Sequence, residues 1–119
     1  ENNAVLMGKS GAPGLSPMEL VLLSTIGCTG MDIVSILTKK RQKIESFKIE
    51  IDDYKRNEDP PKVFNFIEFS YHLEGEIKES GLRQAVKLST EKYCSVSAMI
   101  KESAEIKFKV FLNGEEIVI

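Results

Sequence analysis

The sequence has no tryptophan, a single histidine and only two cysteines among its 119 residues. Two cysteines are too few for the disulfide framework that holds small secreted domains together. One histidine also leaves little choice of imidazole ligands for a metal ion. The sequence shows no secretory signal with a charged start and an apolar middle, so we expect a cytoplasmic protein.

An excess of one sign of charge is missing as well. The 16 basic and 18 acidic residues are interspersed and give a net charge of -2. A nucleic-acid binder usually carries a basic excess, so we expect no nucleic-acid partner. With 42% hydrophobic residues in 119 positions, the chain is predicted to form a single domain over 1–119.

What the sequence does contain is one long apolar run, at 20–37. Ser16 and Glu19 stand before it in the spacing of a helix capping box, and basic residues at 39–43 suit the negative end of a helix. The run is apolar on almost every face, so the predicted helix must be buried. A membrane span is the alternative, but Asp32 near its middle would cost about 2.5–3.5 kcal/mol there. We therefore expect a central helix of a soluble protein and no membrane partner.

Hydrophobic periodicity predicts the remaining elements. In chain order these are a partial strand at 1–8, strands at 46–52 and 63–77, helices at 80–93 and 95–103, and a hairpin at 105–119 that turns at Asn113 and Gly114. This order favours an α+β fold with an antiparallel sheet wrapped around the long central helix. One small sheet cannot cover a helix that is apolar all round. We therefore expect a homodimer, in which the second subunit covers the remaining faces of the helix.

The two cysteines admit several interpretations. Cys28 lies in the middle of the long helix between Gly27 and Gly30, and Cys94 lies between two helices. Both could simply be small buried hydrophobes. Zinc requires about four ligands, which two separated thiols and one histidine do not supply, so no metal is expected. A cysteine hydrolase needs a base, and His72 is predicted on the polar face of a strand. A redox pair needs only two sulfurs that meet, one of them reachable by an oxidant.

Two segments around these cysteines, GLSPMELVLLSTIGCTGMDIVSIL and LRQAVKLSTEKYCSVSAMI, resemble the OsmC/Ohr family of osmotically inducible and organic hydroperoxide resistance proteins, in its YhfA-like branch. The resemblance implies an intertwined homodimer and thiol-dependent reduction of small organic hydroperoxides, without a metal or organic cofactor. It also implies that Cys28 attacks the peroxide and becomes a sulfenic acid. Cys94 would then resolve it as a disulfide, which a dithiol reductant reopens.

In peroxidase members of that family an arginine from an amino-terminal strand holds the thiolate, and a glutamate after the cap proline orients it. That arginine would precede Glu1, and Met18 occupies the position of the glutamate. Glu19, one position later, is a possible supporting residue, although its place in the capping box favours a structural role. Met18 and Met31 are candidates to line an apolar pocket around Cys28. The alternative function is a dimer that binds a small apolar or acyl ligand without turnover.

Overall fold

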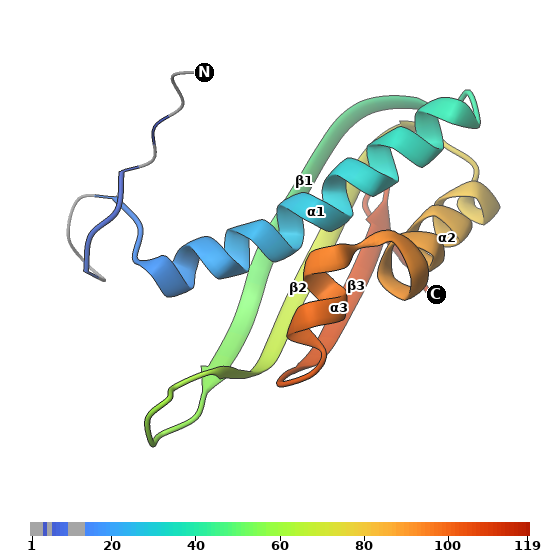
Figure 1. The fold of residues 1–119 in the computed structure, drawn as a ribbon. Helices are drawn as coiled ribbons and strands as arrows, with labels where there is room; N and C mark the ends of the chain where they lie inside the picture. Colours follow the sequence, from blue (N-terminus) through green and yellow to red (C-terminus); the bar gives the residue numbers. More distant parts are fainter. Residues whose placement is uncertain (1–3, 5, 10–13) are drawn as a thin grey trace.

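The computed structural model describes residue 4, residues 6–9 and residues 14–119 (Figure 1). The elements are, in chain order, α1 (Pro17–Lys39), β1 (Lys43–Arg56), β2 (Phe64–Glu76), α2 (Glu79–Leu88), the π-helical turn η1 (Ser89–Tyr93), α3 (Ser95–Ile100), β3 (Glu105–Leu112) and β4 (Glu115–Ile117). The strand predicted at 1–8 lies largely outside the described residues. Within the part that is described, Met7 forms an isolated parallel bridge with Leu15.

The four strands form one sheet in the order β1-β2-β3-β4. β1 pairs with β2, and β3 with β4, in the antiparallel sense, whereas β2 and β3 run parallel, with Tyr71 opposite Val110. The predicted α+β class is therefore confirmed, but the sheet is mixed rather than purely antiparallel. The reason is that α2, η1 and α3 carry the chain back along the sheet before β3 begins, and such a crossover joins parallel strands.

The start of α1 follows the predicted capping box. The backbone N–H of Glu19 donates to the Ser16 hydroxyl at 3.2 Å, and the backbone N–H of Ser16 donates to the Glu19 carboxylate at 3.0 Å. These two bonds satisfy backbone donors that the first turn of a helix cannot satisfy by itself. The entry into the helix that carries Cys28 is therefore fixed by local sequence.

Only one face of α1 is buried in the single chain. That face comprises Leu22, Thr25, Thr29, Gly30, Ile33 and Leu37. The opposite face is open, with Met31 77% exposed, Leu23 44% and Val34 41%. The prediction that this sheet alone does not cover the whole helix is thus confirmed. By length and composition α1 could also cross a membrane, but the core helix of a soluble protein meets the same criteria, and Leu22, Ile33 and Leu37 of α1 belong to the hydrophobic core.

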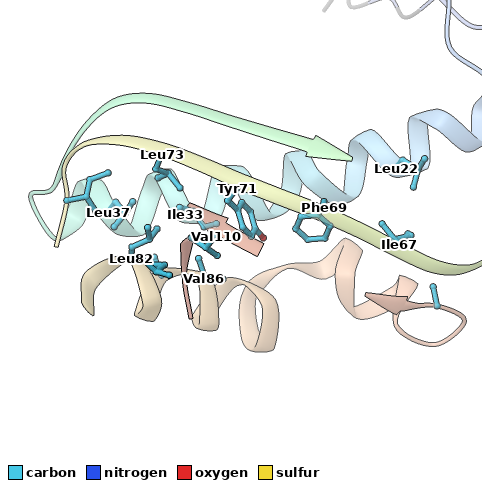
Figure 2. Close-up of a cluster of buried hydrophobic side chains, with 14 of the residues drawn as sticks. Leu22, Ile33, Leu37, Ile67, Phe69, Tyr71, Leu73, Leu82, Val86 and Val110 are labelled. Atoms are coloured by element: carbon cyan, nitrogen blue, oxygen red, sulfur yellow. The ribbon is translucent and has the colours of Figure 1, made fainter. Parts of the chain in front are cut away.

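The core lies between the sheet and the helices. Alternate residues of β2 point toward the helices, as Figure 2 shows for Ile67, Phe69, Tyr71 and Leu73, all of which are at most 1% exposed. They meet side chains of α1, α2 and β3, namely Ile33, Leu37, Leu82, Val86 and Val110. Each buried side chain of this size contributes about 1.5–3 kcal/mol to folding. β2 is therefore the platform on which the helices, and with them both cysteines, are held.

Candidate functional site

The fold brings the two cysteines together although 66 positions separate them. Both thiols are free. The sulfurs of Cys28 and Cys94 and a carboxylate oxygen of Asp32 all lie within 4.8 Å of one another. Cys28 and Asp32 are four residues apart on α1 and so share one face of that helix. The structure thus places two thiols and one carboxylate in a single cluster, which we call the thiol cluster.

The two thiols differ in their access to solvent. Cys94 is 4% exposed, while Cys28 is only partly buried. The expectation that Cys28 lies buried at the centre of its helix is therefore wrong for the single chain. It stands at the border between the buried and exposed faces of α1, next to the buried Thr29 and Gly30.

The turn η1 determines where Cys94 lies. The predicted helix over 80–93 ends as an α-helix at Leu88 and continues as a π-helical turn. The backbone N–H of Cys94 donates to the carbonyl of Ser89 at 2.8 Å, the i to i+5 hydrogen bond of a π-helix. Cys94 is then extended and caps α3, its sulfur accepting the backbone N–H of Ser97 at 3.3 Å. Single π turns are frequent at functional sites, and this one presents Cys94 to α1.

A hydrogen bond from the same turn orients Asp32. The hydroxyl of the fully buried Ser89 donates to the Asp32 carboxylate at 2.9 Å and also lies 3.5 Å from the carbonyl of Thr29. η1 is therefore tied to α1 directly beside the thiols. Sequence reasoning missed this pair, since it used Asp32 only as an argument against a membrane span and placed Ser89 only within the helix predicted at 80–93.

Burial controls the ionisation of Cys94. Loss of hydration raises the pKa of the Cys94 thiol, and the contact with Cys28 raises it further. The hydrogen bond from Ser97 lowers it, but this effect is smaller than that of burial. On the sequence alone, the position of Cys94 before α3 favours stabilisation of its thiolate by the helix dipole. In the structure burial outweighs this, and the pKa of the Cys94 thiol lies above its usual value.

Two buried hydroxyls near the thiol cluster have no hydrogen-bond partner among the described residues, those of Tyr71 and Ser97. Burial raises the pKa of Tyr71 above its usual range, and the neighbouring charges of Cys94 and Asp32 raise it further. Thr29 also lies close to Tyr71 and lowers that pKa, by less than burial raises it, while its own hydroxyl donates to the carbonyl of Ile26 at 3.1 Å. Figure 2 shows the Tyr71 side chain projecting from β2 toward the helices. Such orphaned polar groups are rare in native interiors and call for an explanation.

Two cavities adjoin α1. The first is an open apolar groove of about 570 Å³ between α1 and β1, lined by Ile26, Gly27, Gly30, Met31, Val34, Ser35, Phe47 and Ile49. Met31 lines this groove, whereas Cys28 and Met18 do not; Met18 packs against the core. The groove therefore lies on another side of α1 from the expected pocket, which has the Cys28 sulfur at its floor. The second cavity, of about 500 Å³, reaches the cluster through Asp32 and is lined also by Ser35, Ile36, Lys39, Lys40, Leu88 and Tyr93.

The other residues singled out in the sequence lie apart from the thiols. The Glu19 carboxylate is held in the capping box, where the backbone N–H of Ser16 lowers its pKa. Nine residues of α-helix, a rise of about 13 Å, separate it from Cys28. His72 stacks on Phe111 with ring centres 4.8 Å apart, on the face of β2 opposite to Tyr71. It cannot serve either cysteine as a base, which removes the hydrolase interpretation.

Cys28, Asp32 and Cys94 are also the residues that could hold a metal ion. In the part of the chain that the structure describes, no other group of three histidine, cysteine or acidic side chains lies close enough to share one. Asp32 is a third ligand that the sequence-based ligand count did not include.

Comparison with known proteins places this geometry in a family. The chain is 38% identical over 100 residues to the protein YhfA of Escherichia coli K12, covering 83% of this chain and 74% of that protein. A crystal structure of a protein from Aquifex aeolicus VF5 is similar, with 45% identity, a TM-score of 0.77, and coverage of 92% of this chain and 81% of that one. A structure from Legionella pneumophila, described as an organic hydroperoxide resistance protein OsmC and predicted redox protein, shares the fold at 16% identity and a TM-score of 0.61, over 84% of this chain and 72% of that chain. The family described as OsmC-like protein matches residues 8–109, and the chain belongs to that family.

Proposed function

We propose that this protein is a thiol-dependent peroxidase that reduces organic hydroperoxides through Cys28 and Cys94. The observation that carries the proposal is the approach of two free sulfurs to within 4.8 Å, from helices far apart in the sequence. A disulfide requires a sulfur–sulfur bond of about 2.05 Å, so the two sulfurs must close the remaining separation to form one. Membership in a family that includes a hydroperoxide resistance protein supports the same chemistry.

The difference in exposure supports a separate role for each thiol. Cys28, as thiolate, attacks an oxygen of the hydroperoxide; the O–O bond breaks, a sulfenic acid forms, and the alkoxide takes up a proton to leave as an alcohol. Cys94 then attacks the sulfenic sulfur and water leaves, giving a disulfide. A dithiol reductant restores both thiols by exchange. Cys28 is the more accessible thiol, which suits it to meet the peroxide, whereas Cys94 is buried beside it, which suits it to the second step. Free thiols also suit a reducing, cytoplasmic setting.

The test is consumption of cumene or tert-butyl hydroperoxide with a dithiol reductant. Cys28→Ser is expected to abolish it, and Cys94→Ser to stop turnover after one oxidation, leaving a sulfenic acid that dimedone traps. Ser24→Ala is a matched control, because Ser24 is an exposed residue one turn before Cys28. In the wild type, intact mass after peroxide treatment should show the loss of two hydrogens. Absence of any peroxide-dependent loss of thiols would refute the peroxidase.

We also propose that a second copy of the chain covers the open face of α1. Met31, Leu23 and Val34 form an apolar surface there that continues into the groove beside β1. Met31→Lys is expected to shift the protein from dimer to monomer in light scattering, since it places a charge in that face. Met99→Lys, at a methionine of similar exposure on α3, is the control and should leave the dimer intact. A wild-type protein that is monomeric at micromolar concentration would contradict the proposal.

A non-catalytic ligand-binding protein is the second candidate, and the apolar groove is the observation that favours it. A groove of about 570 Å³ is within the usual range for a small-molecule site. The expected result in that case is saturable binding of a medium-chain acyl probe, weakened by Met31→Lys, together with thiols that remain reduced in hydroperoxide. Turnover of hydroperoxide by the wild type would decide against it.

A further inference from the structure

The thiol cluster has the composition and spacing of an incomplete tetrahedral metal site. Donor atoms around a zinc ion with two sulfur ligands and one oxygen ligand lie roughly 3.5–3.8 Å apart, given bond lengths of about 2.3 and 2.1 Å. The corresponding atoms of Cys28, Asp32 and Cys94 already lie within 4.8 Å of one another. Closing this triangle around a cation therefore requires each donor to move by about an ångström or less.

The groups around these donors resemble the supporting shell of a metal site. The Ser89 hydroxyl fixes the Asp32 carboxylate at 2.9 Å, and the backbone N–H of Ser97 points at the Cys94 sulfur at 3.3 Å. Hydrogen bonds of this kind orient ligands and tune their affinity. The hydroxyl of Tyr71, which is fully buried and without a partner among the described residues, lies near both Cys94 and Asp32. This hydroxyl is therefore a further polar group beside the three donors.

We propose that the reduced protein binds one thiophilic divalent cation, Zn²⁺, through Cys28, Asp32 and Cys94. Two sulfurs select zinc over magnesium and calcium, which prefer oxygen ligands. Three protein ligands leave the fourth position to water, and the Tyr71 hydroxyl can donate to that water or to a ligand oxygen. The cavity that is lined by Asp32 gives the ion a route of entry.

Metal binding and peroxide chemistry use the same sulfur lone pairs, so they exclude each other. This consequence depends on the proposed peroxidase function, whereas the binding itself does not. Oxidation of the two thiolates by one hydroperoxide consumes two protons and yields the disulfide, an alcohol, water and the free cation. Zinc is therefore an inhibitor of turnover, and a hydroperoxide is a signal that releases zinc.

The experiment titrates Zn²⁺ into reduced protein against a chromophoric chelator, without peroxide. One equivalent per chain is expected to bind, and Cd²⁺ should give the ultraviolet charge-transfer band of a cadmium thiolate. Cys28→Ser and Asp32→Asn should each weaken zinc binding by about tenfold or more. Asp59→Asn, in the exposed loop after β1, is the matched control and should bind like wild type. Circular dichroism establishes that each variant is folded.

Failure to bind zinc above the level of a variant lacking both cysteines would overturn the inference. So would affinity unchanged by Asp32→Asn, since the carboxylate would then not be a ligand. Wild-type protein supplies a measurement that needs no variant: conversion to the disulfide by an oxidant such as diamide should abolish binding, and retention would contradict the site. Zinc binding without peroxide turnover would uphold this site and refute the peroxidase. Peroxide turnover without zinc binding would uphold the peroxidase and refute this site.

Discussion

Replacing Tyr71 with phenylalanine is expected to raise the free energy of unfolding. The same substitution at most buried tyrosines lowers it, because the hydroxyl is usually hydrogen-bonded. The Tyr71 ring packs between Phe69, Phe108 and Phe47, with ring centres 5.2, 5.9 and 6.2 Å away. A phenylalanine ring at this position would keep all of these contacts. Only the hydroxyl is lost, and in the folded chain it is buried without a partner among the described residues, whereas water solvates it in the unfolded chain.

The magnitude follows from that difference in solvation. An unsatisfied buried hydroxyl destabilises a fold by about 1–3 kcal/mol. Tyr71→Phe should therefore raise the free energy of unfolding by at least about 1 kcal/mol, which corresponds to a rise in Tm of about 4 °C for a chain of this size. Denaturant unfolding and calorimetry on reduced, metal-free protein at one fixed concentration measure both quantities. Tyr54→Phe, at a tyrosine that is 45% exposed, is the control and should change stability by less than about 0.5 kcal/mol.

A loss of stability in Tyr71→Phe would refute this reasoning, because it would mean that the hydroxyl is hydrogen-bonded in the folded protein. A gain in stability accompanied by weaker zinc binding is the result that connects the orphaned hydroxyl to the thiol cluster. A tyrosine at position 71 would then lower the stability of the fold, and its hydroxyl would contribute a hydrogen bond to the bound metal's ligands.

Four further predictions concern the elements that carry the site. Ser16→Ala removes the helix cap of α1 and should lower the free energy of unfolding by about 1 kcal/mol in urea titrations at pH 7. The Glu19 pKa is lowered below its usual 4.5, so its stabilising effect is present above that value and is lost as the pH falls through the lower, folded pKa. Accordingly, Glu19→Gln should be less stable than wild type at neutral pH, and the gap should close in acid. Gly75 has φ of 143° and a Cβ there would meet the carbonyl of Lys43, so Gly75→Ala should cost about 2 kcal/mol, while Gly27→Ala, with open space around it, should gain about 0.5–1 kcal/mol. Iodoacetamide should modify Cys28 before Cys94 in peptide mass mapping, because Cys94 is 4% exposed and burial raises the pKa of its thiol.

Local patterns predicted most of the elements. The capping box gives the start of α1, and alternation locates β1 and β2, although both ends of β1 extend beyond the predicted 46–52. The Asn113 and Gly114 turn joins β3 to β4, with both residues at positive φ. The parallel pairing of β2 and β3 was not predictable in this way. It depends on the route that α2, η1 and α3 take across the sheet, which is a tertiary property with no period in the sequence.

The candidate site was likewise predictable only in part from local sequence. Recognition of the family motifs around Cys28 and Cys94 identified the pair, but neither spacing nor periodicity could show that they meet. Their approach depends on the π turn that begins at Ser89. The residues of this turn have the same hydrophobic spacing as an α-helix, so the sequence gives no sign of the wider turn. The Asp32 carboxylate is drawn into the cluster by the same turn, through the Ser89 hydroxyl.

The π turn therefore decides which chemistry the cluster can perform. An α-helix continued through 89–93 would direct the following residue to a different side of its axis, since each residue rotates by about 100°. It would also lose the hydrogen bond from Cys94 to Ser89 that closes the wider turn. With Cys94 turned away, Cys28 and Asp32 would remain as one thiol and one carboxylate on α1, able neither to form an internal disulfide nor to chelate a thiophilic ion. The proposed dithiol chemistry thus depends on η1 as much as on the cysteines themselves.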